Sequence, residues 1–448
     1  MPLTRHRLAV SVLLTLSAFA ARAENLQELY QAGLGYDASY LSARASLDAA
    51  QYRLDQVYAL RRPSVNLGIS GGRSTSSTPD ALSTQSANTT QYGATVSATQ
   101  SLFNRPNDKT ITQAERALDV ARSDFAAAEQ DLIIRISQAY FDVLAAQDTL
   151  ATARSSSAAI SEQVASAKRN FEFGTATITD TREAQARYDL ARATEIVADN
   201  DLTNKRIALD QLVGRVNVAP KQLAVPVQLP PVVPAALEEW VARGDAEHPL
   251  VRKARLALEI AQLETEKAKA GHLPTVALNA NVGRGHSSTQ GYLQGVPPAY
   301  DSTSPSTTAG VSVTLSMPLF AGYAIQNRVK ETLSLETKSE DDLVAARRGV
   351  EQATRTAFYG VRSGTAQVAA LEAAESSSQL ALDATQLGYK VGVRVNIDVL
   401  NAQAQLYSTQ AQLAQARYNV VMAGLKLRQA SGRLTAEDIA AVNQLLQR

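Results

Sequence analysis

The chain of 448 residues offers few side chains suited to covalent catalysis. Its best match to a catalytic motif is the G-x-S-x-G pattern at residues 68–72. That motif needs a sharp turn from a strand into a helix, whereas residues 68–72 continue an alternating segment and lead into a Gly- and Ser-rich stretch. Beyond residue 23 the histidines are His248, His272 and His286, without metal-ligand spacing. With no G-x-x-x-x-G-K loop and no cysteine, the sequence predicts neither an enzyme nor a cofactor or metal site.

Two aspartates stand out instead, because each occupies the same place in a long internal repeat. Residues 171–214 align without gaps with residues 389–432, at a constant offset of 218 residues. The matched residues include Gly174 and Gly392, Asp180 and Asp398, and Gly214 and Gly432. A repeat of this length indicates a duplicated architecture. We therefore expect one body with a first repeat at 24–219, a Pro-rich connector at 220–234, a second repeat at 235–432 and a C-terminal segment at 433–448.

The first 23 residues have the pattern of a secretory signal peptide. Arg5 and Arg7 precede an apolar run over residues 8–20, and Ala21-Arg22-Ala23 resembles an A-x-A cleavage site. Without this segment the chain has 41 basic and 43 acidic side chains, a balance that does not favour nucleic acid. No later run of about 18 apolar residues exists, so any membrane contact must come from strands.

Two long stretches have the heptad spacing of coiled-coil helices. The first runs from residue 105 to about 170 and the second from 324 to about 386. The apolar positions are Ile111, Leu118, Phe125, Leu132 and Ala139, then Val329, Leu343, Val350 and Ala357. At about 1.5 Å per residue these helices would be roughly 100 Å long. Shorter helices are expected at 26–60, 180–213, 237–270 and 398–430. A soluble coiled coil is the simplest alternative interpretation.

Strand pairs interrupt each repeat, at 63–103 and 274–320. In all four segments apolar residues alternate with small polar ones, which is typical of strands with one apolar face, and about 9–11 such residues can span an outer membrane. The stretches 73–90 and 285–307, rich in Ser, Thr, Gly and Pro, are expected to be solvent-exposed loops. Four aromatic residues are either membrane-interface residues or packed rings: Tyr92, Phe103, Phe320 and Tyr323.

The number of strands predicts an oligomer. Four strands cannot close a membrane barrel, and an open edge in lipid would leave backbone groups unpaired. Two copies would give eight strands with a filled interior, whereas three copies would give twelve strands and a lumen. The sequence therefore predicts a mostly α-helical chain that also contributes to a membrane β-barrel, with an internally duplicated unit of helices and a strand pair.

The chain resembles the TolC family of outer-membrane channel-tunnels. The segments that carry the resemblance are AENLQELYQAGL (23–34), GHLPTVALNANVG (271–283), MPLFAGY (317–323), GYKVGVRVNIDVLNAQ (388–403) and LAQARYNVVMAGLKLRQASG (413–432). The resemblance implies a homotrimer in the outer membrane of a Gram-negative bacterium, with a 12-stranded barrel above a periplasmic helical barrel. It also implies a periplasmic adaptor and an inner-membrane ABC or proton-driven transporter as partners. The expected function is an exit duct for type I protein secretion, with drug efflux as the first alternative and a periplasmic coiled-coil adaptor without a pore as the second.

The resemblance implies that Asp398 lines the narrowest aperture of the duct. A second aspartate usually follows three residues later in similar proteins, but this chain has Asn401. A single ring of carboxylates would attract cations with a weaker field than two rings. Asp398 also suits the first turn of a helix, so capping is the alternative role, and the two roles are compatible.

The resemblance also assigns links that hold the tip closed. Tyr389 and Arg394 flank the turn glycine and are expected to bond to Asp180 on the neighbouring coiled coil, with Thr179 nearby. Exposed links of this kind contribute roughly 0–1 kcal/mol each, so partner binding can break them. Asp180 has an alternative role too, because Thr177 precedes it at capping distance.

The turn glycines are expected to end the long helices and to lie at an exposed tip. This position makes the turns the expected docking site for the adaptor. The residues assigned to it are Gly174, Thr175, Gly392 and Val393.

Overall fold

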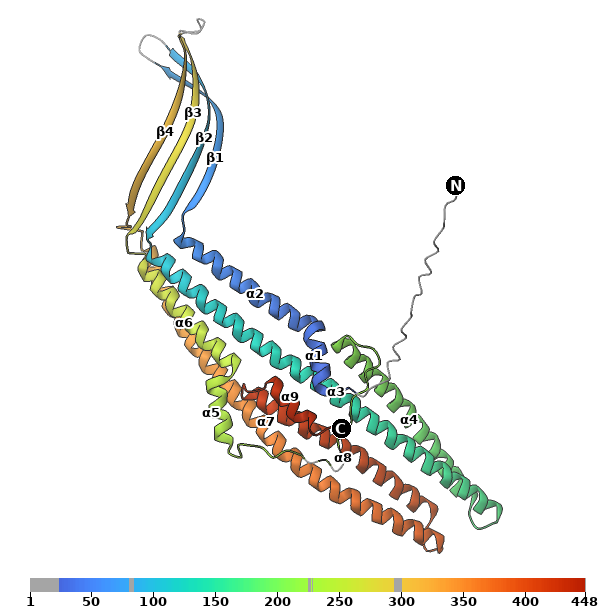
Figure 1. The fold of residues 1–448 in the computed structure, drawn as a ribbon. Helices are drawn as coiled ribbons and strands as arrows, with labels where there is room; N and C mark the ends of the chain where they lie inside the picture. The colour runs from blue at the N-terminus through green and yellow to red at the C-terminus, as the bar shows by residue number, and fades with distance from the viewer. Residues whose placement is uncertain (1–23, 80–83, 225–226, 228, 294–299, 448) are drawn as a thin grey trace, which may run out of the picture.

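The computed structural model describes residues 24–79, 84–224, 227, 229–293 and 300–447. The signal peptide expected at residues 1–23 lies outside the described residues. The described chain is elongated, with four strands forming a curved sheet at one end (Figure 1). The helices extend from this sheet to two turns at the opposite end, which we call the tip turns, α3 to α4 and α7 to α8.

Both halves of the chain follow one order of elements, which confirms the predicted duplication. The first half contains α1 (Leu26–Tyr36), α2 (Ala38–Tyr58), the short helix η1 (Ala59–Arg61), β1 (Ser64–Pro79), β2 (Thr84–Phe103), α3 (Arg105–Glu172) and α4 (Ile178–Val213). The second contains α5 (Leu237–Glu247), α6 (Pro249–Ala270), β3 (Thr275–Leu293), β4 (Tyr300–Ser316), α7 (Ala324–Lys390) and α8 (Asn396–Ala430), followed by α9 (Ala436–Asn443). Within the described residues no helix combines the length and apolarity needed to cross a membrane.

The single helix predicted over 26–60 is wrong, because the chain breaks at Asp37 between α1 and α2. The Asp37 backbone is extended, and its carboxylate accepts a hydrogen bond from the Tyr40 amide at 2.8 Å. Arg135 on α3 donates two more, at 2.7 and 2.9 Å, and these bonds lower the pKa of the buried Asp37 carboxyl. A capping aspartate paired to another helix thus ends α1 and starts α2.

The helix predicted over 237–270 is also divided, between α5 and α6. Pro249 is the first residue of α6, and proline restricts the residue before it to extended backbone. His248 accordingly is extended, and its Nδ1 accepts a hydrogen bond from the Leu250 amide at 3.1 Å. The proline was a visible break signal that the apolar pattern on either side obscured.

The glycines at the ends of the two repeats lie close to the residues where these helices break. Gly214 has φ 69°, and a Cβ there would come within 2.4 Å of the Tyr36 ring. Gly432 has φ 75°, and its Cβ would lie 2.5 Å from the His248 Cα. Both a left-handed backbone and a close approach therefore require glycine at the end of α4 and α8.

The four strands form one antiparallel sheet in the order β1-β2-β3-β4, so the pairing of β2 with β3 joins the repeats. The strands are longer than predicted, and much of the loops expected at 73–90 and 285–307 is paired strand. Thr and Ser side chains support this extension across strands, as in the 2.7 Å bond from Thr75 to Asn88. Alternation of apolar residues could not reveal it, because both faces are polar there. Residues 80–83 and 294–299 lie outside the described residues.

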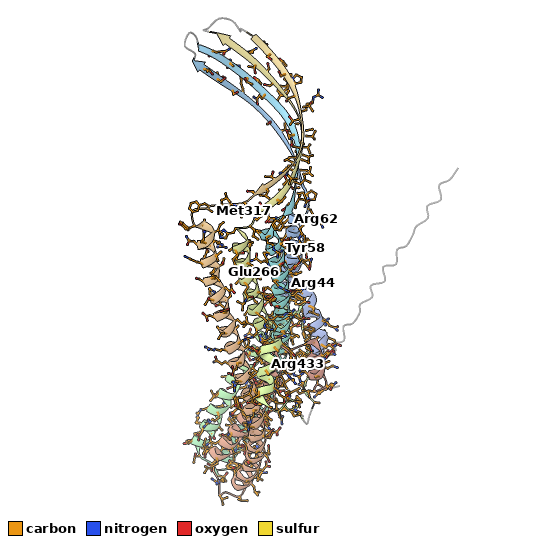
Figure 2. All side chains as sticks on the ribbon, turned by 90° about the vertical axis from the view of Figure 1, so that its left-hand side faces the viewer. Arg44, Tyr58, Arg62, Glu266, Met317 and Arg433 are labelled. Carbon is orange, nitrogen blue, oxygen red and sulfur yellow. The ribbon has the colours of Figure 1, made fainter. Side chains whose placement is uncertain are left out.

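The pairing register separates an apolar face of the sheet from a polar one. One row across the sheet holds Val65, Ala98, Ala280 and Val311, and the next holds Leu67, Val96, Val282 and Ala309. The opposite face carries rows such as Asn66, Ser97, Asn281 and Gly310. The apolar face is uncovered in the chain: Val65 is 66% exposed and Ile69 is 79% exposed. Met317 and Arg62 lie where the sheet meets the helices (Figure 2).

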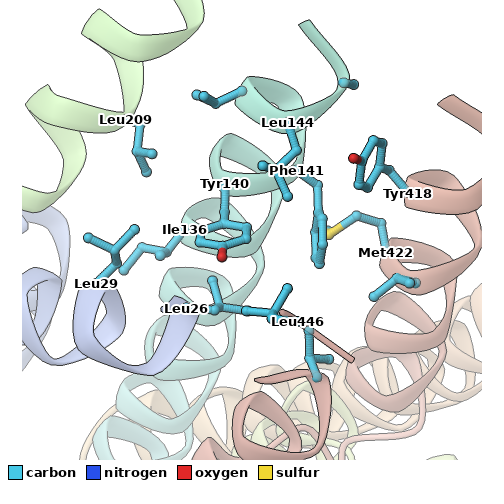
Figure 3. Close-up of a cluster of buried hydrophobic side chains, with 14 of the residues drawn as sticks. Leu26, Leu29, Ile136, Tyr140, Phe141, Leu144, Leu209, Tyr418, Met422 and Leu446 are labelled. Carbon is cyan, nitrogen blue, oxygen red and sulfur yellow. The ribbon is translucent and has the colours of Figure 1, made fainter. Parts of the chain in front are cut away.

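The largest buried cluster lies near the middle of the helical region, where α1, α3, α4, α8 and α9 meet (Figure 3). Tyr140, Phe141 and Tyr418 lie at its centre, and the Tyr140 hydroxyl donates to the Lys221 carbonyl at 2.7 Å. The last residues also pack here, since the Gln447 amide donates to the Gln222 carbonyl. The C-terminal segment thus contains a helix, α9, that the sequence pattern did not indicate.

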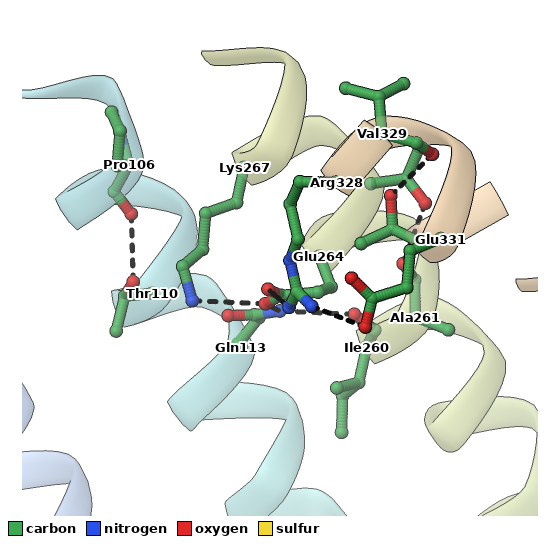
Figure 4. A network of polar contacts seen from close by, with 12 residues as sticks. Pro106, Thr110, Gln113, Ile260, Ala261, Glu264, Lys267, Arg328, Val329 and Glu331 are labelled. Atoms are coloured by element: carbon green, nitrogen blue, oxygen red, sulfur yellow. Dashed lines mark hydrogen bonds and ion pairs between the residues drawn. The ribbon is translucent and has the colours of Figure 1, made fainter. Parts of the chain in front are cut away.

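The heptad prediction is confirmed for the long helices. Ile111, Leu118 and Leu132 on α3 are buried, as are Leu343 and Val350 on α7. Near the sheet, a polar network ties α3, α6 and α7 together around Glu264 (Figure 4). Its partners are Gln113 at 2.9 Å, Arg328 at 2.8 Å and Lys267 at 3.1 Å. Burial would raise the pKa of Glu264, but these hydrogen bonds outweigh it and lower the pKa to about 2.

Candidate functional site

The two tip turns have one backbone conformation. Gly174 has φ 73° and Gly392 has φ 81°, the left-handed conformation that ends a helix and reverses the chain. Equivalent hydrogen bonds, with N···O distances of 2.8–3.1 Å, join the amides of Gly174, Thr175, Gly392 and Val393 to the carbonyls of Phe171, Asn170, Tyr389 and Gly388, respectively. Residues that are 218 positions apart in the sequence therefore have the same backbone conformation in the two turns.

The residues assigned to adaptor docking are all exposed at the far end of the helices (Figure 1). Val393 is 76% exposed, and its neighbour Val391 is also largely exposed. In the first turn Phe173 is exposed beside Gly174. Each turn thus presents a glycine next to an uncovered apolar side chain.

Asp180 starts α4 in a capping box. Its Oδ2 accepts hydrogen bonds from the Thr177 amide at 2.9 Å and the Thr177 hydroxyl at 2.8 Å. Its own amide donates to the Thr177 hydroxyl at 3.2 Å. Thr179 is exposed. The capping role considered for Asp180 is therefore present in the structure.

Asp398 occupies the equivalent place on α8 but has weaker local partners. Val395 stands where Thr177 does and has no side-chain hydroxyl, so only its amide reaches Asp398 Oδ2, at 3.5 Å. The Arg394 guanidinium lies 3.6 Å from the same oxygen. The Asp398 carboxylate is thus paired with a cation at the turn rather than bound tightly in a capping box.

The assigned gate residues form contacts other than the predicted one. Tyr389 on α7 accepts a hydrogen bond through its hydroxyl from Asn170 Nδ2 on α3, at 3.0 Å. Arg394 pairs with Asp398, while Asp180 bonds to Thr177. Within the part of the chain that the structure describes, neither Tyr389 nor Arg394 is bonded to Asp180.

Polar side chains that sequence reasoning did not single out connect the two coiled coils above the tip. Gln163 on α3 donates to Asn396 at the start of α8. Asn396 is buried, and its Nδ2 has no hydrogen-bond partner among the described residues. Arg187 on α4 donates to Asn401 Oδ1 at 3.3 Å. A pattern of apolar and polar residues does not show which amide side chains are buried. These pairs are therefore identified only once the helices are placed next to one another.

Comparison with known proteins agrees with this arrangement. The family model for "Outer membrane efflux protein" matches residues 29–215 and 242–433, once in each half. The outer membrane protein TolC of Vibrio cholerae is 30% identical over 440 residues, which cover 97% of this chain and 97% of that protein. The alkaline protease secretion protein AprF of Pseudomonas aeruginosa is 31% identical, over 78% of this chain and 72% of AprF.

A solved structure shows the same fold. The outer membrane protein VceC of V. cholerae superposes with a TM-score of 0.72 at 19% sequence identity, over 91% of this chain and 96% of VceC. The sequence matches extend over both repeats and nearly the whole described chain. The chain therefore belongs to the outer membrane efflux protein family, and its place is the outer membrane.

Proposed function

We propose that three copies of this chain form a passive exit duct through the outer membrane and into the periplasm. The observation that carries the proposal is the four-stranded sheet, which has an uncovered apolar face and, in the described chain, pairs β1 and β4 on one side only. Each unpaired backbone group at a strand edge costs several kcal/mol in lipid. Pairing β1 of one copy with β4 of the next removes every edge.

Three copies suit the two faces of the sheet better than two. Twelve strands enclose a lumen, which gives the polar face of Asn and Ser side chains an aqueous surface. The apolar face then meets lipid. The exposed aromatic residues fit this orientation, since Phe103, Phe320 and Tyr323 lie near the helical end of the strands and remain exposed, although the rings of Phe320 and Tyr323 contact each other edge to face.

The tip turns form the periplasmic entrance. Asp398 and Asn401 from three chains line the aperture, and Tyr389, Arg394, Asp180 and Thr179 contribute to the contacts that keep it closed. The lack of a capping hydroxyl at Val395 supports an aperture role, because only the Val395 amide at 3.5 Å and the Arg394 guanidinium at 3.6 Å hold the Asp398 carboxylate. Opening separates the α7–α8 coiled coil from α3–α4, so it must break hydrogen bonds such as Asn170–Tyr389 and Arg187–Asn401 and uncover the apolar cluster around Leu400.

Partners supply the energy and the cargo. An adaptor docks at Gly174, Thr175, Gly392 and Val393, where exposed apolar side chains flank both turns. An inner-membrane ABC or proton-driven transporter drives transport through it. The similarity to AprF, named as a protease secretion protein, supports type I protein secretion as the first assignment. The family description supports efflux as the second.

Planar bilayers test the duct. The purified full chain should elute as a trimer and give discrete, cation-preferring conductance steps. A bilayer that stays silent, together with a protein that remains soluble without detergent, would instead favour a periplasmic coiled-coil adaptor. Crosslinking from the tip turns in cells, at Thr175 and Val393, then identifies the transporter class.

A further inference from the structure

All the strong cations of the described strands lie on the apolar face of the sheet. Arg73 continues the alternation of Val65, Leu67 and Ile69 on β1, and Arg284 continues that of Val282 on β3. These two are the only Arg or Lys residues in the described strands, and both side chains are exposed. The opposite, polar face carries neither. A charged residue on an apolar face is unfavourable in hydrocarbon, so its position along the strand matters.

The two arginines lie in or beyond the last apolar row, toward the end of the sheet away from the helices. Arg284 shares a row with Ile69 and Ala94, directly after the row of Val282. The next row holds Tyr92 and His286, whose rings stack with centroids 4.9 Å apart. Arg73 lies one row further. An aromatic pair flanked by cations is typical of a membrane strand at the boundary between the hydrocarbon core and the lipid headgroups.

The spacing of the arginines suits a ligand with two anionic groups. By strand geometry they are about 13 Å apart along the strands and about 10 Å apart across them, and their long side chains can turn toward one another. Asp301, the acid of the described strands on this face, lies roughly 20 Å beyond Arg284 toward the hairpin ends. Asp301 is therefore too far from Arg284 to pair with it, and it lies about 7 Å beyond the row of Arg73 along the strands and three strands across the sheet. Arg guanidinium groups bind phosphate through paired hydrogen bonds.

We propose that Arg73 and Arg284 bind the phosphate groups of a diphosphorylated glycolipid in the outer leaflet, while Tyr92 and His286 pack against its sugar headgroup. The inference rests on the proposed function, because it needs the apolar face in lipid and the helices in the periplasm. The hairpin end of the sheet then faces the cell exterior, where the outer leaflet lies. Each trimer carries three such sites.

Native mass spectrometry of the full-length trimer in detergent tests the site. The probes are diphosphoryl lipid A, its monophosphoryl form and phosphatidylglycerol. The wild-type trimer should bind the diphosphoryl lipid about tenfold more tightly than either of the others, and Arg73→Gln with Arg284→Gln should remove that preference. Arg284→Lys, which keeps the charge but loses the planar fork, should weaken binding less than Arg284→Gln. Arg44→Gln on α2 removes one positive charge, as Arg284→Gln does, but at an exposed helical position, and it should leave binding unchanged (Figure 2).

Two results would overturn the site: unchanged binding of diphosphoryl lipid A by the double variant, or equal binding of phosphatidylglycerol by the wild type. Conductance in planar bilayers separates this failure from failure of the duct. A double variant that conducts like the wild type, with lipid preference lost, supports both. A wild-type protein that conducts but has no lipid preference refutes the glycolipid site alone, and a silent wild-type protein refutes the duct.

Discussion

The two tip turns share a backbone and differ in what holds their aspartates. At the first turn, Thr177 binds Asp180 through its amide and its hydroxyl. At the second, Val395 offers only an amide to Asp398, and Arg394 supplies a counter-charge at 3.6 Å. One repeat therefore holds its carboxylate in a helix cap, while the other leaves it next to a neighbouring cation.

A second difference lies one turn earlier, at matched positions 170 and 388. Asn170 in the first copy reaches across to the Tyr389 hydroxyl of the second. Gly388 in the second copy leaves space for Arg394, since a Cβ there would lie 2.8 Å from the Arg394 Cγ. Duplication thus preserved the backbone of the turn, while substitutions at a few positions changed the side-chain contacts of each copy.

The largest expected effect comes from removing each aspartate in turn. Asp398→Ala should reduce the cation preference of the channel by roughly tenfold, because the aperture loses its ring of carboxylates. Asp180→Ala should leave selectivity unchanged and cost about 1 kcal/mol of helix-cap stability. Reversal potentials in a salt gradient measure the first effect, and thermal unfolding measures the second.

Arg394→Ser provides the matched control for that comparison. Removing the guanidinium beside Asp398 should raise both conductance and cation preference, since the carboxylate loses its counter-charge. Equal selectivity changes in the Asp180 and Asp398 variants would show that the two turns are not specialised.

The next effect concerns the hydrogen bond between coiled coils. Tyr389→Phe and Asn170→Ala should each raise conductance severalfold by weakening the closed tip, as loss of a bond of about 1 kcal/mol allows. The double variant should add little to either single variant, because both remove the same 3.0 Å bond. Additive increases would mean that Tyr389 has another partner, such as Asp180 of a neighbouring chain.

Much of this fold could be predicted from sequence because its signals are periodic. Heptads marked the long helices, alternation marked the strands, and the glycine and aspartate pairs marked the turns. Breaks within an amphipathic stretch were missed: Asp37 reads as a surface residue until Arg135 is placed beside it. The outer parts of the strands were missed because polar residues on both faces leave no period to detect.

The candidate site was predictable in position but not in pairing. The turn glycines and Asp398 follow from the repeat and the resemblance, whereas partners such as Asn170 and Arg187 depend on how two coiled coils lie against each other. A hydrogen bond between residues more than 200 positions apart leaves no local pattern. The sequence therefore locates the tip turns more readily than it identifies the contacts between them.

A smaller effect, on stability alone, tests whether gating is confined to the tip. Glu264 lies near the sheet, and hydrogen bonds lower its pKa to about 2, although burial opposes them. Because the pKa is below its unfolded value near 4.5, the network contributes fully above pH 4.5 and loses its contribution as pH falls toward 2. Glu264→Gln should cost roughly 1–2 kcal/mol at neutral pH, seen as a lower melting temperature, and little once the pH is below the folded pKa of about 2. Conductance and selectivity should not change, and a change in either would extend the gate beyond the tip.

The smallest effect comes from restoring a second aspartate at the aperture. Asn401 Oδ1 accepts a hydrogen bond from Arg187 at 3.3 Å, so Asn401→Asp would convert this contact into an exposed ion pair. Such pairs contribute about 0–1 kcal/mol, and the pair joins α4 to α8, so the substitution should lower the open probability slightly in low salt. High salt should remove the effect by screening. Arg187→Gln in the Asn401→Asp background should free the new carboxylate and raise cation preference instead. If Asn401→Asp raises cation preference strongly while Arg187 is still present, then Arg187 does not pair with residue 401 in the assembled channel, and the two coiled coils are further apart there than in the single chain.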